Sequence, residues 1–491
     1  MSQTILTSCL KDTGNYDYKE LTPIVIEKST LPSTLIKKQL EYIVINPVVK
    51  QGSDDSNLKY EWRLIQASYS ADPVTGSYYN VKVSDTKNIN YKITANPGNY
   101  ILILYVTDSK NGVTELAKID VVVESYASKG WMVLHGDNTS CDVSIVVNPR
   151  VNAGWTTDFV QHNVFSETNG KKIEGEGMHL QYVGSHWVNV FTKGSKGGYR
   201  SNGNDLRIMN SFNDMFMSPL AESEVEFNAY DMWSYNELLI NKGALYFTSQ
   251  ADVNIYNKFG VKCFGEDYYA APFVATIYNW SYYGVIYDQK NRRFLYIDYN
   301  RIIKQFKTPG ASAAFNMTNV GKEMIYAEHG FDSRWYCLMQ DGVNSSTREL
   351  YVCKFNVSDD GNRGVAKYDI RNNTDLSNAK YFAFGNRGNV MYYATDTKIY
   401  QSNYAGDLSS VLRYDISSAF PGYVITKMKI FKVSGNANES KLLYVAIYNP
   451  ADKQGKLLEI DINEATGEMS TTGMRTYTGF SKISAMNYKT R

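Results

Sequence analysis

The stretch from Glu266 to Gly284 has the strongest chemical character in this chain of 491 residues. It reads EDYYAAPFVATIYNWSYYG, so aromatic rings stand beside carboxylate and amide side chains. A flat apolar ring next to oriented hydrogen-bond partners is a surface on which sugar rings and peptide side chains bind. The sequence therefore predicts a ligand-binding surface that contains Tyr268, Tyr269, Tyr278, Trp280, Tyr282 and Tyr283. The alternative is that these rings fill a core, because the chain holds 40 tyrosines in all.

Motifs for catalysis and for metal or cofactor binding are missing from the sequence. It contains no G-x-S-x-G turn, phosphate loop, dinucleotide fingerprint, CxxC pair or HExxH motif. We therefore predict no catalytic residue, no metal site and no cofactor, and interpret His179 and His186 as structural. A glycoside hydrolase or polysaccharide lyase is the alternative, because two carboxylates from distant strands leave no pattern in one sequence. The candidates for such a pair are Asp267, Asp298 and Glu328.

Charge and composition narrow the class of protein. The 51 Lys and Arg residues balance the 50 Asp and Glu residues, and no segment concentrates basic side chains. Nucleic acid would find no basic footprint, so we predict no nucleic-acid partner. The longest apolar run, Tyr100–Val106, is far shorter than the roughly 20 residues of a membrane-spanning helix. Short β-branched and aromatic runs separated by Asn, Asp and Gly indicate an all-β chain.

Residues 130–491 repeat one theme, a pair of apolar runs joined by a turn. Seven such hairpins recur at intervals of roughly 50 residues, a period typical of propeller blades. The isolated run Phe480–Lys489 would complete the first blade and leave no open sheet edge. We predict a seven-bladed β-propeller, with six or eight blades or further β-sandwiches as alternatives. Gly194–Gly203 is expected to be a surface loop, or a loop that gates one face.

Residues 22–125 alternate apolar and polar positions in short runs, which predicts a β-sandwich. Two segments sharpen this prediction: Tyr60-Glu-Trp62, and PGNYILILYVTDSKNG from Pro97 to Gly112. They resemble the YxW strand and the PGxYxVxLxVTDxxG strand and turn of PKD domains, which have an immunoglobulin-like fold. Trp62 is then expected in the core and Asp108–Gly112 in a hairpin turn. In this position the domain would act as a spacer.

Leu6-Thr7-Ser8-Cys9 resembles the bacterial lipobox, where signal peptidase II cleaves and the cysteine receives diacylglycerol. Eight residues are too few for the basic and apolar regions of a leader, so Met1 is expected to be internal to a longer signal peptide or to mark a start assigned too late. The remainder of residues 1–21 is polar and aperiodic, which suits a flexible tether. We predict lipid attachment at Cys9, with two or more acyl chains for firm anchoring.

The run CLKDTGNYDYKEL from Cys9 to Leu21, followed by a sandwich and a propeller, resembles the PKD-like outer-membrane lipoproteins of Bacteroidetes. Such proteins are commonly found beside starch-utilisation-type importers. The resemblance implies a protein held on the cell surface at the outer membrane by its lipid alone. It would be a non-enzymatic accessory that captures a glycan or peptide nutrient, or docks to a TonB-dependent importer complex. A pure protein–protein scaffold is the alternative, beside the hydrolase or lyase.

Overall fold

The structure is a computed structural model that describes residues 21–490, except 54, 68–77, 185–186, 232–235, 249–256, 277–281, 343 and 356–362. Strands dominate these residues, which confirms the all-β prediction. The helical elements described are α1 (Val164–Asn169) and the 3-10 turns η1 (Lys28–Thr30), η2 (Asn213–Met215), η3 (Phe331–Ser333) and η4 (Leu376–Asn378). The chain forms two compact units, residues 1–126 and 127–491, and each is described by itself.

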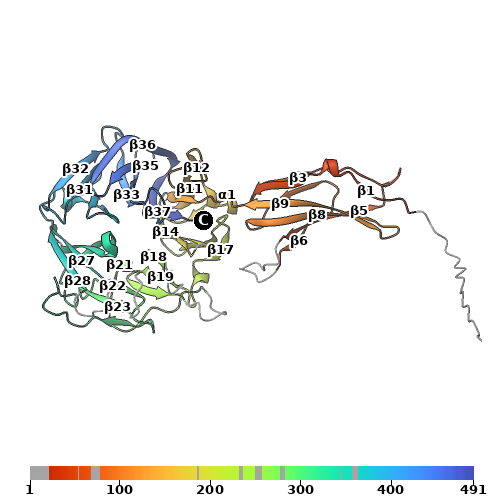
Figure 1. Cartoon of the computed structure of the whole chain (residues 1–491). Coiled ribbons are helices and arrows are strands. Elements are labelled where there is room, and N and C mark those ends of the chain that lie inside the picture. Colours follow the sequence, from red (N-terminus) through yellow and green to blue (C-terminus); the bar gives the residue numbers. More distant parts are fainter. Residues whose placement is uncertain are drawn as a thin grey trace, which may run out of the picture. The chain divides into compact units, whose positions relative to one another are not determined.

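The first unit contains one five-stranded sheet and two small ones, which share a single apolar core (Figure 1). The large sheet has the order β2 (Thr34–Lys38), β9 (Thr114–Glu124), β8 (Gly98–Asp108), β5 (Leu58–Gln66) and β6 (Asn80–Ser84). The small sheets pair β1 (Val25–Ile26) with β4 (Val49–Lys50), and β3 (Tyr42–Ile45) with β7 (Ile89–Lys92). The pair β2 and β9 is parallel, whereas β5, β8 and β9 are antiparallel neighbours.

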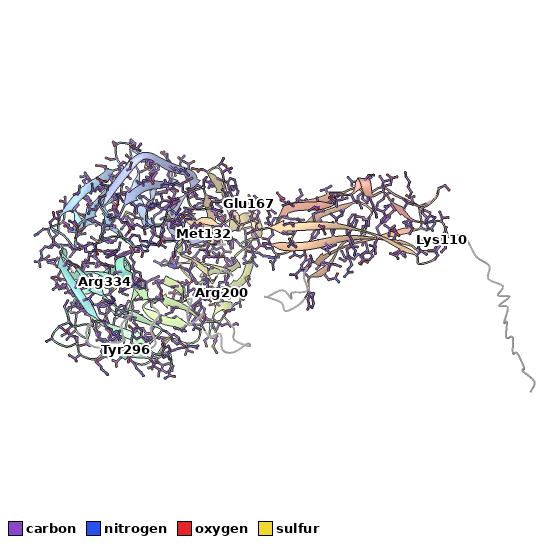
Figure 2. The ribbon with its side chains drawn as sticks, in the orientation of Figure 1. Lys110, Met132, Glu167, Arg200, Tyr296 and Arg334 are labelled. Carbon is purple, nitrogen blue, oxygen red and sulfur yellow. The ribbon has the colours of Figure 1, made fainter. Side chains whose placement is uncertain are left out.

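The core prediction for this unit is confirmed at Trp62, whose side chain is fully buried on β5. Its indole Nε1 donates a hydrogen bond to the Thr86 carbonyl at 3.1 Å, which satisfies the one polar atom of the ring. The hairpin turn is confirmed as well, because Lys110 lies between β8 and β9 (Figure 2). In that turn the Asp108 carboxylate accepts from the Lys110 amide at 2.9 Å and from the Asn111 side chain at 2.8 Å.

The described residues of the second unit form seven antiparallel sheets, each built from strands close in sequence except the first. One strand at the edge of each sheet contacts the corresponding strand of the next sheet, and we term these the inner strands. They are β37 (Lys482–Lys489), β14 (Gly177–Val183), β18 (Val225–Asp231), β21 (Ala270–Ala275), β25 (Glu323–His329), β29 (Tyr381–Phe384) and β33 (Val424–Ile430). The contacts between inner strands return to their start, because β33 of the last sheet lies against β37 of the first.

The other strands follow outward from each inner strand. In sheet order they are β10 (Gly130–Gly136), β11 (Ser140–Val147), β12 (Phe159–Gln161) and β13 (Ile173–Glu174); β15 (Trp187–Thr192), β16 (Gly198–Asn202) and β17 (Ile208–Ser211); β19 (Asn236–Asn241) and β20 (Ala244–Phe247); β22 (Gly284–Asp288), β23 (Arg293–Ile297) and β24 (Ile303–Gln305); β26 (Trp335–Asp341), β27 (Asn344–Cys353) and β28 (Gly364–Asp369); β30 (Met391–Ala394), β31 (Lys398–Ser402) and β32 (Ser410–Asp415); and β34 (Leu442–Asn449), β35 (Gln454–Asn463) and β36 (Glu468–Phe480).

The C-terminal strand β37 pairs antiparallel with β10, the first strand of the unit, as the isolated last run predicted. Polar contacts join the first sheet to the seventh. The Asn148 side chain, which follows β11, donates to the buried Glu459 carboxylate of β35 at 2.6 Å, and Arg150 lies 3.0 Å from the same carboxylate. Backbone pairing therefore holds the C-terminal strand in the first sheet, and a buried charge joins the first sheet to the seventh.

The expectation of a loop at Gly194–Gly203 holds for the turn at residues 194–197 but is wrong for Gly198–Asn202, which form strand β16. Two consecutive glycines with positive φ, Gly197 at 67° and Gly198 at 99°, turn the chain into that strand. Arg200 is buried within it, labelled in Figure 2, and its guanidinium lies 2.7 Å from the buried Glu237 carboxylate. A polar, glycine-rich sequence thus forms a strand because its arginine has a partner on the next sheet.

Candidate functional site

Tyr268 and Tyr282, two of the predicted binding aromatics, are buried and use their hydroxyls inside the protein. Tyr268 is 5% exposed; its hydroxyl donates to the Cys263 carbonyl at 2.9 Å and accepts from the Leu245 amide at 3.2 Å. Tyr282 is 3% exposed and donates to the Phe355 carbonyl at 2.7 Å. Both rings therefore contribute to packing, and both hydroxyls are engaged by the backbone.

The other predicted aromatics lie in different surroundings. Tyr269 is 49% exposed and is the ring of the stretch most open to solvent among the described residues. Tyr283 is half-buried, with its ring centroid 5.0 Å from that of Tyr299. Tyr278 and Trp280 lie outside the described residues. The described rings of this stretch thus divide between packing and surface, and their use as one ligand platform stays a prediction.

Each carboxylate considered for catalysis is paired with a different lysine. The pairs are Asp267 with Lys290, Asp298 with Lys304, and Glu328 with Lys432. Two-carboxylate glycoside hydrolysis needs one acid whose pKa is raised, so that it can donate a proton. The hydrogen bond from Lys290 instead lowers the pKa of Asp267. The described geometry of these three residues therefore does not favour an acid–base pair.

Ser144 and His135 are in contact in the first sheet, but they are not arranged as a nucleophile and base. The Ser481 backbone amide donates to Nδ1 of His135 at 3.2 Å, so the ring hydrogen resides on Nε2 and is donated to the Ser144 hydroxyl at 2.8 Å. Burial lowers the pKa of His135 to about 4. A base must accept the serine proton, and this ring donates one instead.

The inner strand β33 carries exposed lysines between buried apolar residues. Met428 and Ile430 are 7% and 3% exposed, whereas Lys427 and Lys429 are exposed. Side chains two residues apart on a strand point to the same side and are separated by about 7 Å along it. The two lysine side chains therefore leave the same side of β33, opposite the face that packs in the core.

Neighbouring strands add further amines to this surface. Lys429 donates to the Met486 carbonyl of β37 at 3.2 Å. Lys482, the first residue of β37, is exposed and interacts electrostatically with Lys427. Lys432, just after β33, interacts with Lys429 in the same way. We term Lys427, Lys429, Lys432 and Lys482 the lysine cluster; in the described part of the chain, Lys427 and Lys482 have neither an ion pair nor a side-chain hydrogen bond.

The surroundings of Lys427 and Lys429 disfavour their charged forms. Burial among the inner strands lowers the pKa of both amines, although their side chains reach solvent. Lys482 lowers the pKa of Lys427 further, and Lys432 and Lys427 lower that of Lys429 against the opposing effect of Glu328. Mutual repulsion between exposed amines marks a place where an anion would be stabilised.

Two groups from other inner strands face the same cluster. His179 on β14 has its pKa lowered to about 4, chiefly by burial, with Lys429 and Lys427 contributing against the hydrogen bond to Asn228. Glu328 on β25 accepts from the Lys432 amine at 2.9 Å. Among the charged groups of the described residues that act on Lys427 and Lys429, Glu328 is thus the one carboxylate, and positive charge is in excess.

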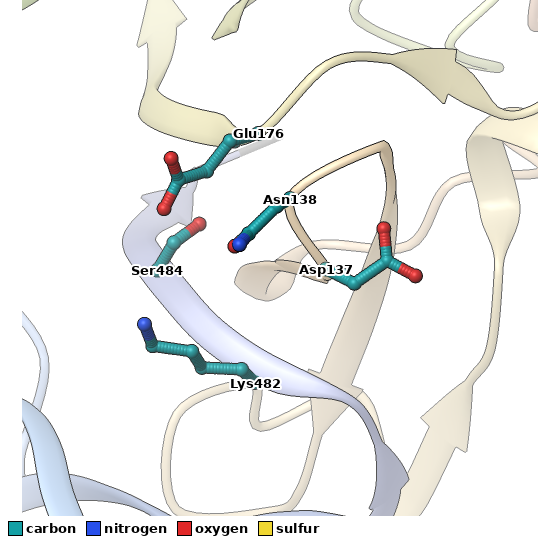
Figure 3. A pocket seen from close by; sticks show the side chains of 7 residues that line it. Asp137, Asn138, Glu176, Lys482 and Ser484 are labelled. Atoms are coloured by element: carbon teal, nitrogen blue, oxygen red, sulfur yellow. The ribbon is translucent and has the colours of Figure 1, made fainter. Parts of the chain in front are cut away.

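A small hollow of about 20 Å³ opens beside Lys482, where β14 and β37 begin (Figure 3). Its lining residues are Gly136, Asp137, Asn138, Glu176, Gly177, Lys482 and Ser484. Figure 3 shows the Glu176 and Lys482 side chains on one side of the hollow, with the Asp137 carboxylate turned away from them. The hollow is therefore large enough for about one water-sized polar group, such as a single hydroxyl of a longer ligand.

The lysine cluster was missed at the level of sequence, although a signal for it exists. Val424–Ile430 reads VITKMKI, an apolar strand in which lysines take alternate positions. The same pattern fits an ordinary strand with one face in solvent. Only the packing of β33 against β37, and the electrostatic reach to β14 and β25, distinguishes the two cases.

Comparison with protein families gives one match, in which residues 9–177 match the model of the PKD-like family. The N-terminal part of the chain is therefore PKD-like, and the match extends over strands β10 to β13 of the second unit to the start of β14. No curated protein sequence matches the chain. Within the described residues there is no helix long and apolar enough to span a membrane, and no group of three or more His, Cys, Asp or Glu side chains placed to hold a metal ion.

Solved structures with some likeness to the chain share little sequence with it. A quinonprotein alcohol dehydrogenase-like protein from Bacteroides thetaiotaomicron has 15% identity and a TM-score of 0.47, covering 95% of this chain and 99% of that one. An auxiliary nutrient binding protein from the same organism has 9% identity and a TM-score of 0.29, covering 94% and 72%. The WD40 domain of SCAP from fission yeast has 8% identity and a TM-score of 0.36, covering 62% and 74%.

Proposed function

We propose that this protein is a surface lipoprotein whose second unit is a seven-bladed β-propeller that binds a nutrient without changing it chemically. It serves as an accessory to a TonB-dependent importer of the starch-utilisation type at the outer membrane. The observation that best supports this proposal is the lysine cluster. Exposed amines from β33 and β37 face groups from β14 and β25, so side chains from several sheets converge on one surface.

The propeller part of the proposal is supported by the order of the sheets. Successive sheets place their first strands side by side, and the last segment of the chain supplies the inner strand of the first sheet. Propellers close their ring in this way, which leaves no sheet edge open to other chains. In such a ring the inner strands surround the axis, where ligands have access to several blades at once.

Binding is favoured over catalysis by the state of the titratable groups. The carboxylates considered for acid–base chemistry are held by lysines, and His135 donates its hydrogen to the serine beside it. The lysine cluster offers positive charge, and among the described residues Lys427 and Lys482 have no ion-pair partner. Such a surface is suited to bind an anionic ligand.

The membrane part of the proposal depends on Cys9, which lies outside the described residues. Metabolic labelling with a fatty-acid analogue should mark the full-length gene product and not its Cys9→Ser variant, since the thiol is the acylation site. The wild-type protein should also be cleaved by protease added to intact cells. Label that persists in the variant, or protection from protease in intact cells, would remove the surface assignment.

The binding role itself is tested with the purified full chain on glycan and peptide arrays, together with growth of a deletion strain on candidate nutrients. We expect ligands of one class to bind and growth on that nutrient to slow. Empty arrays with normal growth would overturn the role. In that case, co-purification with an importer would leave the scaffold alternative, and release of products from a polysaccharide would establish the enzyme alternative.

A further inference from the structure

The lysine cluster has a charge excess that the protein itself leaves uncompensated. Lys432 is neutralised by Glu328, but Lys427 and Lys482 interact with each other across β33 and β37, and no carboxylate in the described part of the chain acts on Lys427. Folding like charges against one another opposes stability, so such an arrangement persists where an anion offsets it. Lys427 and Lys429 also do not serve to cover apolar surface with their side chains, because both side chains are exposed.

The spacing of the amines indicates the length and the charge of the ligand. Lys427 and Lys429 leave β33 about 7 Å apart along the strand. Lys482 lies at the start of β37, beside the hollow, and its repulsion of Lys427 places it near the same row. One small anion does not span this row. A ligand with several anionic groups along its length does.

The hollow beside Lys482 indicates what separates these anionic groups. Glu176 and Asn138 share the lining with Ser484, so the hollow offers a carboxylate, an amide and a hydroxyl next to the amine. The Glu176 carboxylate repels anions and accepts hydrogen bonds from neutral donors. Sugar hydroxyls are such donors, whereas a run of acidic peptide side chains would bring its charges against Glu176.

We propose that the lysine cluster and the hollow of Figure 3 together bind an acidic oligosaccharide, whose carboxylate or sulfate groups pair with Lys427, Lys429 and Lys482 and whose hydroxyls reach Glu176. This inference rests on the proposed nutrient-binding function and names the class of its ligand. The contacts are charge-assisted hydrogen bonds, which are roughly twice as strong as neutral ones.

The test is isothermal titration of the full chain with four probes: oligogalacturonate, chondroitin sulfate oligosaccharide, maltoheptaose and polyglutamate. The first two carry carboxylate alone or carboxylate with sulfate, so they separate the two sources of charge. We expect at least one of them to bind, more weakly as salt rises because the charges are screened. Lys427→Gln/Lys429→Gln should lower that affinity at least tenfold, while Lys427→Arg/Lys429→Arg retains it.

The matched control is Lys441→Gln, an exposed lysine just before β34 in the same sheet, which should leave affinity unchanged. Circular dichroism and thermal melting of each variant show that lost binding is not lost folding. Glu176→Gln should weaken oligosaccharide binding and strengthen any binding of polyglutamate, because it removes both the acceptor charge and the repulsion.

Several outcomes would overturn the inference. They are no binding of either acidic oligosaccharide, binding that survives in the double glutamine variant, and polyglutamate binding as tight as that of the sugars. If only maltoheptaose binds, and binds the wild type and the double variant equally, this inference fails and the proposed function remains intact. If no glycan, peptide or importer is bound at all, both fail together.

Discussion

The aromatic stretch Glu266–Gly284 and the strand β33 teach opposite lessons about what a conspicuous sequence means. The stretch is rich in rings, yet Tyr268 and Tyr282 are buried and bonded to the backbone. Strand β33 is inconspicuous, yet Lys427 and Lys429 stand exposed against groups from other inner strands. Composition reports how much apolar surface must be buried, whereas a binding surface depends on which sheets meet.

Of the changes considered, truncation of Tyr282 should destabilise the protein most. Its ring lies against Tyr296 and Phe306, with centroids 5.6 and 6.0 Å away. Tyr282→Ala should lower the free energy of unfolding by about 3–5 kcal/mol, since truncation of a buried aromatic leaves a cavity. Denaturant melts measure the loss. Tyr269→Ala, at an exposed ring in the same stretch, is the control and should stay within about 0.5 kcal/mol of wild type.

Lowering the pH should destabilise the protein through its buried histidines. Burial lowers the pKa of His135, His179 and His329 to about 4, from an ordinary value of 6.5. Between these values the unfolded chain binds more protons than the folded one, so stability should fall as pH drops from 6.5 toward 4, by at most about 1.4 kcal/mol per pH unit for each histidine.

Melting temperatures at pH 7, 6 and 5 check this slope, and His179→Gln should flatten part of it. A bound anion should lessen the loss that comes from His179, because it stabilises the imidazolium. Melting temperatures that stay level down to pH 5 would show that these rings are not held neutral.

Tyr268→Phe sharpens the comparison at a single hydroxyl. The Cys263 carbonyl and the Leu245 amide lose their shared partner, so we expect a cost of about 1–2 kcal/mol. Ligand binding should not change. If this variant bound ligand less well but melted like wild type, the tyrosine would belong to a binding surface after all.

Removing charge from the lysine cluster should have the smallest effect on stability. Lys427→Gln is expected to keep the free energy of unfolding within about 0.5 kcal/mol of wild type, or to raise it, because repulsion from Lys482 is relieved. Chemical denaturation at low and at high salt measures this, with Lys441→Gln as the control. A large loss of stability would assign the amine to the fold rather than to a ligand.

The features of the fold that depend on local sequence patterns could be predicted from the sequence. Alternation placed Trp62 in the core of the first unit, and an isolated last run predicted that the C-terminal strand pairs with the start of the second unit. Both could be predicted from sequence. A strand with one buried face shows regular alternation of apolar and polar residues, and a strand with no neighbour in sequence must pair with a distant one.

Features that depend on a distant partner could not be read in the same way. Gly194–Gly203 has the composition of a loop, but Arg200 finds Glu237 on the next sheet and Gly198–Asn202 form a strand. The lysine cluster similarly exists only where β33 packs against β37, a strand that begins more than fifty residues further along the chain. A single sequence does not state which charges face each other across sheets.

The most direct measurement compares two double variants in titrations with the tightest acidic oligosaccharide, one lacking the amines of Lys427 and Lys429 and one lacking the rings of Tyr269 and Tyr283. Our account predicts that Lys427→Gln/Lys429→Gln weakens binding at least tenfold and that Tyr269→Ala/Tyr283→Ala leaves it within about twofold. Binding that depends on the two rings and tolerates loss of the two amines would contradict it.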